Sequence, residues 1–214
     1  MKIMRQIFII ISAFYTCLLS AQNLTEDLNT YLDQNNKQIT AEEFVRIMDS
    51  QDVLVVDNDS LKTYKIVTER IVKGKIGNFE LIAEKLQSRT NIVIDRTKPI
   101  VVIYHPGKDR YNSSGSSSKS ERRTWFNTLT RKVKRIAEVE PIYVYKTKEG
   151  TERYEGILTW HKDPEGIIER TFFDYHYPSS SYVLLSPNGN YITAYGEWPK
   201  ELLWKHLEEL VNQN

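Results

Sequence analysis

The apolar positions in the first part of the chain recur at helix and strand spacings. Residues 24–34 place three leucines on one stripe, which predicts a short helix. Residues 40–43 read Thr-Ala-Glu-Glu before an apolar run, the spacing of a capping box, and predict the start of a second helix. The β-branched runs at 52–57 and 63–72 predict strands, and helical spacing returns at 78–87. We therefore expect this part to form helices and strands that pack against the second half of the chain.

The pattern changes in the second half of the chain. Residues 98–104 are a continuous apolar run, typical of a strand buried on both faces, whereas 105–119 have no apolar periodicity. Ser120 is the expected N-cap of a helix over 121–140 whose apolar residues share one face. Pro141 ends that helix and the sequence IYVYK predicts a strand. Strand, helix and strand in succession form one βαβ unit.

The remaining sequence predicts two hairpins and two helices. Residues 153–160 are expected to pair back as a hairpin strand. Asp163 and Pro164 are the expected N-cap and first position of a helix. Two strands, 181–185 and 190–196, flank the turn sequence SPNG, and 199–210 predicts an amphipathic closing helix.

The N-terminus has the order of a secretory signal. Lys2 and Arg5 precede an apolar run, and small residues follow it. We expect residues 1–21 to be removed by cleavage after Ala21, which predicts an exported protein, periplasmic or secreted, with no transmembrane anchor afterwards. Two alternatives stay open: an uncleaved anchor, and a lipoprotein acylated on Cys17.

Cysteine usage and charge exclude several classes of function. Cys17 is the only cysteine of the 214 residues, so cleavage leaves none. A disulfide, a thiolate nucleophile and a cysteine-ligated metal are then excluded. The formal net charge of +1 gives no reason to expect a nucleic acid partner.

The order of elements from Lys98 onward resembles the thioredoxin-like fold superfamily, in particular its exported branch. The resemblance rests on the βαβ unit, the helix after it, the sequence YPSSSYVLLSPNGNYITAYGEW and the closing helix. It implies an α/β fold in which residues 98–214 form a thioredoxin-like three-layer sandwich with a central mixed sheet. Residues 22–97 would be an N-terminal helical and β extension, an α/β addition that comes after the signal peptide.

The resemblance also places a groove in the chain. In the family, a buried strand runs into a Cys-x-x-Cys motif at a helix N-terminus, and a cis-proline faces that motif. Here the sequence HPGKDRYNSSGSSSKS stands at the motif's place, which excludes dithiol exchange, and Pro178 is the candidate for the proline. The resemblance therefore implies that residues 105–120 face residues 174–181.

We expect this groove to bind a protein or peptide of the cell envelope, without catalysis and without a cofactor. Trp160 is expected at a binding rim, whereas Trp125 and Trp198 are expected in the core, and the basic residues of the helix over 121–140 are expected on a solvated face. The predicted binding residues are His105, Lys108, Asp109, Tyr111, Asn112, Tyr177 and Pro178.

An enzyme is the competing hypothesis. Acid/base chemistry at the same groove would use His105 and His176 with Asp109 or Asp174. Nitrogen and oxygen ligands also suit a metal such as zinc, although their spacing matches no known signature. The candidate ligands are His105, Asp109, His161, Asp163, Asp174 and His176. In a third interpretation the domain supports a neighbouring protein of an envelope assembly through a surface elsewhere.

Two motifs are excluded from the serine-rich segment. A phosphate-binding P-loop requires Gly and Ser or Thr where this chain has Val102 and Asp109. The chain also lacks the Gly-x-Ser-x-Gly elbow that positions a nucleophilic serine.

Overall fold

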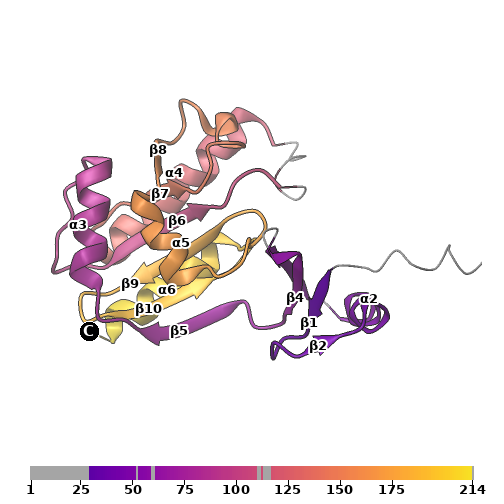
Figure 1. Cartoon of the computed structure of the whole chain (residues 1–214). Helices are drawn as coiled ribbons and strands as arrows, with labels where there is room; N and C mark the ends of the chain where they lie inside the picture. The colour runs from indigo at the N-terminus through magenta and orange to yellow at the C-terminus, as the bar shows by residue number, and fades with distance from the viewer. Residues whose placement is uncertain (1–28, 52, 59–60, 110–111, 113–116, 214) are drawn as a thin grey trace, which may run out of the picture.

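The computed structural model describes residues 29–213 except residues 52, 59–60, 110–111 and 113–116. Over these residues the chain forms two mixed β-sheets and five α-helices (Figure 1). The part described contains no helix that is both long enough and apolar enough to cross a bilayer. The predicted signal peptide, Cys17 and Tyr111 lie outside the described residues.

A four-stranded sheet with the order β2-β1-β4-β3 begins the described chain. β1 runs parallel to β4, and the other neighbours are antiparallel. The Thr40 hydroxyl accepts the Glu43 N–H at 3.1 Å, so the predicted helix start is confirmed. The elements are β1 (Thr30–Leu32), β2 (Gln38–Ile39), α2 (Ala41–Ser50), β3 (Leu54–Asn58) and β4 (Thr63–Val67).

A six-stranded sheet with the order β5-β10-β9-β6-β7-β8 is formed by the rest of the chain. β6, β7 and β8 are parallel, whereas β9 is antiparallel to β6, and β10 is antiparallel to both β9 and β5. Figure 1 shows the four-stranded sheet with α2 to one side of this larger sheet. The strands are β5 (Ile71–Lys75), β6 (Ile100–His105), β7 (Ile142–Tyr145), β8 (Trp160–Lys162), β9 (Ser181–Leu185) and β10 (Asn190–Ala194).

Helices cover both faces of the larger sheet. On one face, Val101 and Ile103 of β6 share a core with α4 and α6, and on the other face Ile100, Val102 and Tyr104 share a core with α3 and α5. Covered on both sides, β6 is buried along its whole length, as its continuous apolar sequence predicts. The helices are α3 (Phe79–Thr90), α4 (Lys119–Ala137), α5 (Ile167–Phe172) and α6 (Lys200–Asn212).

Two element predictions are wrong, each because pairing overrides a local pattern. The helix predicted over 24–34 is a strand in its described part, since Thr30–Leu32 pairs with β4. Residues 153–160 do not form a hairpin strand: Glu152–Tyr154 is a 3₁₀ turn, and β8 pairs parallel to β7.

The predicted strand over 63–72 is divided between the two sheets. β4 belongs to the four-stranded sheet, whereas β5 pairs with β10 along five residue pairs. α3 also packs into the core of the larger sheet. The domain boundary predicted between residues 97 and 98 therefore falls among elements that share one sheet and its cores.

The start of α4 differs from the prediction by two residues. Ser118, rather than Ser120, is the N-cap: its hydroxyl accepts the Glu121 N–H at 3.2 Å, and the Glu121 carboxylate accepts the Ser118 N–H at 2.7 Å. This reciprocal pair is a capping box. A glutamate three residues after Ser118 favours that serine over Ser120.

The β9-β10 hairpin is confirmed, and its turn requires glycine. Gly189 has a φ of +88°, and a Cβ there would lie 2.1 Å from the Ile76 carbonyl oxygen. The predicted N-cap Asp163 instead reaches past a 3₁₀ turn, Pro164–Gly166, and its carboxylate accepts the N–H groups of Ile168 and Glu169.

Candidate functional site

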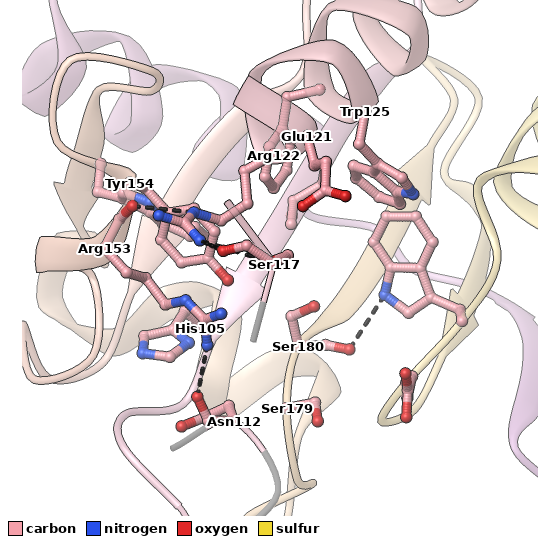
Figure 2. Close-up of a pocket in the computed structure, with 15 residues that line it drawn as sticks. His105, Asn112, Ser117, Glu121, Arg122, Trp125, Arg153, Tyr154, Ser179 and Ser180 are labelled. Atoms are coloured by element: carbon pink, nitrogen blue, oxygen red, sulfur yellow. Dashed lines mark hydrogen bonds between the residues drawn. The ribbon is translucent and has the colours of Figure 1, made fainter. Parts of the chain in front are cut away.

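A cavity of about 390 Å³ opens where β6 ends. The first two turns of α4 form one wall, the segment from Arg153 to β8 forms another, and the residues before β9 and α6 complete it (Figure 2). The lining residues are Ile103, His105, Asn112, Ser117, Glu121, Arg122, Trp125, Phe126, Arg153, Tyr154, Trp160, Ser179, Ser180, Glu197 and Trp198.

Aromatic rings form a continuous surface in the cavity. The Trp125 ring lies 4.7 Å from Phe126 and 5.7 Å from Trp198, measured between ring centroids. Phe126 in turn lies 5.5 Å from Tyr154, and Tyr154 lies 5.7 Å from Trp160. Such tilted and edge-to-face contacts hold large rings rigidly, so the surface is preformed.

His105 is a lining residue whose ring is held in place by its neighbours. The side chain is 3% exposed, its Nε2 hydrogen-bonds with the Glu149 carbonyl oxygen at 2.9 Å, and its ring lies 5.6 Å from that of Trp160. Burial lowers the pKa of His105, and hydrogen bonds to the Glu149 and Ser179 backbone oppose that shift only in part. The imidazole is therefore neutral near pH 7.

Asp109 joins the two facing segments that the resemblance predicts. Its carboxylate accepts the Asn112 backbone N–H, the Asn112 side-chain amide and the Ser179 N–H, each at 2.8 Å. Ser179 has a φ of +68°, a left-handed conformation that a serine adopts only when its surroundings hold it there. Asp109 supplies that restraint at the rim of the cavity.

Two arginines form a second polar side. The Arg122 Nε donates to the Arg153 carbonyl oxygen at 3.1 Å, and Arg122 also donates to the Ser117 carbonyl. The Arg153 guanidinium donates to the Asn112 carbonyl oxygen at 2.7 Å. Burial raises the pKa of Tyr154, and the positive charges of Arg153 and Arg122 oppose this shift. Both guanidiniums therefore lie close enough to the Tyr154 hydroxyl to affect it electrostatically.

Two predicted binding residues line the cavity, and a third supports it. His105 and Asn112 are lining residues, and Asp109 holds Asn112 and Ser179 in place. Lys108 is exposed and does not line the cavity. Tyr111 lies outside the described residues.

Tyr177 and Pro178 point elsewhere. Tyr177 is buried in the core, where its ring stacks on Tyr195 with centroids 4.1 Å apart. Pro178 lines a separate cavity of about 270 Å³ beside Met48 and Leu54. No cis peptide bond occurs within the described residues, so Pro178 does not have the cis bond of the family proline for which the resemblance makes it a candidate. The next two residues, Ser179 and Ser180, line the main cavity, where we expected Tyr177 and Pro178.

The six candidate metal ligands do not converge. Among the described residues, no group of three or more His, Cys, Asp and Glu side chains is arranged to hold a metal ion. One pair does approach: the His176 Nε2 lies 3.6 Å from an Asp109 carboxylate oxygen. His161 lines a different cavity, and Asp163 is buried with its carboxylate bonded to the backbone of α5.

Sequence reasoning missed the contribution of α4. Trp160 lines the cavity, as its predicted place at a binding rim implies. Trp125 and Trp198, expected only in the core, also line it, as does Arg122, expected on a solvated face. The sequence did contain a signal for this wall. Once Ser118 is taken as the N-cap, Glu121, Arg122 and Trp125 fall in the first two turns of the helix, at spacings that place them close together.

The arrangement suits binding of a small apolar group. A preformed aromatic surface, with a few polar groups held by hydrogen bonds, is the usual make-up of a ligand site. Comparisons of the chain with protein-family models, curated proteins and solved structures find no match.

Proposed function

We propose that this protein is an exported, thioredoxin-like protein without redox cysteines, and that its cavity binds a segment of a protein or peptide. The order of elements supports the fold: β6, α4 and β7, then α5, the β9-β10 hairpin and α6, as the resemblance implies. The cavity lies where β6 leads to the start of α4, which is the family's active-site position. The only cysteine, Cys17, belongs to the predicted signal, so the site serves binding rather than dithiol exchange.

The observation that carries this proposal is the volume of the cavity together with its aromatic lining. A volume of about 390 Å³ is near the lower end of ligand pockets, enough for one large side chain and its neighbouring backbone. Aromatic rings form much of its surface, and they bind apolar side chains with little loss of their own conformational entropy. Extended peptide segments are recognised specifically when one of their side chains enters a pocket of this kind.

The rim offers polar groups of fixed geometry. Asp109 holds the Ser179 backbone, and the Ser180 carbonyl oxygen accepts the Trp198 indole N–H at 3.0 Å. Arg153 and Asn112 are likewise joined, since the Arg153 guanidinium donates to the Asn112 carbonyl oxygen. A site with its polar groups already positioned loses less entropy when a flexible peptide binds.

Peptide capture tests the proposal. The purified protein is immobilised and exposed to a tryptic digest of an envelope extract, and retained peptides are identified by mass spectrometry. The matched variants are Trp125→Leu, in the cavity, and Trp204→Leu, a half-buried tryptophan of α6 outside it. We expect Trp125→Leu to lose the retained peptides and Trp204→Leu to keep them. Equal retention by both variants would contradict binding in the cavity.

An acid/base activity is the second candidate, and one contact favours it. His176 and Asp109 approach within 3.6 Å, and the His176 Nε2 is buried without a hydrogen bond among the described residues. An activity based on this pair would disappear in His176→Asn, while the Trp125→Leu variant would retain its chemical step. Substrate screening with these two variants separates the two hypotheses.

A further inference from the structure

The cavity has two chemically different sides. Figure 2 shows Arg122, Arg153 and Tyr154 on one side, and Trp125 on the other. Trp125 lies next to Trp198, which also lines the cavity. A ligand that fills the cavity therefore meets cationic donors at one end and two tryptophan rings at the other.

The two guanidiniums are held for recognition of an anion. Both arginines are partly buried, and their bonds to the Arg153, Ser117 and Asn112 carbonyl oxygens fix the direction of each side chain. Arg122 forms no ion pair at contact distance with another described residue, although its charge attracts the neighbouring Glu121 carboxylate and lowers the pKa of Glu121. A guanidinium has five N–H donors in a planar fork that matches a carboxylate, and two adjacent guanidiniums strengthen the attraction.

Of the two acidic lining residues, Glu121 offsets the Arg122 charge only in part. Glu121 lies near Trp125 rather than near Arg153 (Figure 2), and its carboxylate accepts the Ser118 N–H in the capping box. Hydrogen bonds with Ser118 lower the pKa of Glu121, and the Arg122 charge lowers it further, so the carboxylate stays ionised while it caps the helix. Glu197 is exposed at the edge before α6. The negative charges thus belong to the same part of the cavity as the tryptophans, or to its rim.

We propose that the cavity binds the C-terminal residue of a peptide. Its carboxylate contacts Arg122 and Arg153, and its side chain, aromatic or large aliphatic, packs against Trp125 and Trp198. A chain end suits the cavity because a main-chain carboxylate and the adjacent side chain leave one Cα in different directions, toward the two sides. The proposal rests on the peptide-binding function proposed above and specifies its ligand.

Three pools of synthetic peptides test the ligand class. The first pool holds acetylated tetrapeptides with random residues and a free C-terminal carboxylate. The second holds the same sequences as C-terminal amides, and the third holds amides with an internal Asp followed by Phe. Each pool is passed over the immobilised protein, and retained species are measured by mass spectrometry. We expect the free-acid pool to be retained about tenfold or more over both amide pools, with Phe, Tyr, Trp or Leu enriched at the last position.

Arginine variants locate the carboxylate. Arg122→Gln and Arg153→Gln are each expected to weaken retention of the free acids about tenfold, toward the level of the amides. Arg123→Gln is the matched control, because Arg123 is an exposed neighbour on α4 that does not line the cavity. Arg122→Lys and Arg153→Lys keep the charge without the planar fork, and they are expected to recover part of the preference. The lysine variants also preserve the test if a glutamine variant fails to fold.

The outcomes separate this inference from the proposed function. Equal retention of free acids and amides, both lost in Trp125→Leu, would overturn the carboxylate inference and leave peptide binding standing. Retention of the internal Asp pool alone would show that the carboxylate comes from a side chain, which also overturns the C-terminal assignment. Retention of no pool would overturn both the inference and the peptide-binding proposal.

Discussion

At the scale of single residues, the site depends on side chains that are fixed by other segments. Asp109 anchors Asn112 and Ser179, and the Glu149 carbonyl anchors His105. His105 and Asn112 were predictable because His105 ends a buried strand that leads to a helix start, and Asn112 lies between the two. The burial of Tyr177 was not predictable, because its stacking partner Tyr195 comes from a segment beyond β10, and nothing local shows which way Tyr177 points.

The buried imidazole of His105 predicts a pH dependence of stability. Burial places its pKa below the ordinary value of about 6.5, so the unfolded chain binds more protons as the pH falls below about 6.5. This contribution to the free energy of unfolding is complete above that pH and is lost as the pH falls toward the lower folded pKa. Urea unfolding between pH 7.5 and 5 is expected to show decreasing stability.

His105→Gln provides the control, because a glutamine amide can still donate to the Glu149 carbonyl and does not titrate in this range. We expect the pH slope to be smaller in this variant than in the wild type. Identical slopes in the two proteins would show that His105 is not the group responsible.

At the scale of elements, local signals were reliable for the longer helices and the buried strands. α3, α4, α6 and β6 were predicted because their apolar spacing continues over several turns or positions. The shorter elements were not: β8 has three residues, too few to distinguish a hairpin partner from a parallel edge strand. The N-cap of α4 was also misplaced, although the glutamate that completes the capping box was visible in the sequence.

Substitution of the two candidate N-caps tests this correction. Ser118→Ala removes the hydroxyl that accepts the Glu121 N–H and is expected to reduce the free energy of unfolding by about 1 kcal/mol. Ser120→Ala, within the first turn of the helix, is expected to change it by less than about 0.5 kcal/mol. Urea denaturation of both variants gives the comparison, and a greater loss for Ser120→Ala would contradict the observed cap.

At the scale of the whole molecule, the fold joins segments that are distant in sequence. β5 pairs with β10, and the α3 residues Ile82 and Leu86 are fully buried in the core beneath the same sheet. The hydrophobic pattern identified β5 as part of a strand but carried no information about its partner. The predicted boundary at residue 97 therefore separates elements that the structure places together.

Two truncations test this arrangement. A fragment of residues 98–214 lacks β5 and α3, so the outer edge of β10 and one apolar face of the sheet lose their cover. We expect this fragment to aggregate or to unfold without cooperativity. A fragment of residues 69–214 retains both elements and is expected to unfold cooperatively in urea. Cooperative unfolding of the shorter fragment would contradict the role assigned to β5 and α3.

The indole N–H resonances report directly whether a bound peptide occupies the cavity. The chain has four tryptophans, of which Trp125, Trp160 and Trp198 line the cavity, whereas Trp204 does not. In a ¹H–¹⁵N spectrum titrated with a peptide retained from the envelope digest, we predict shifts of the three cavity indoles and none of Trp204. A peptide that binds while leaving the three cavity indoles unmoved would contradict binding in the cavity.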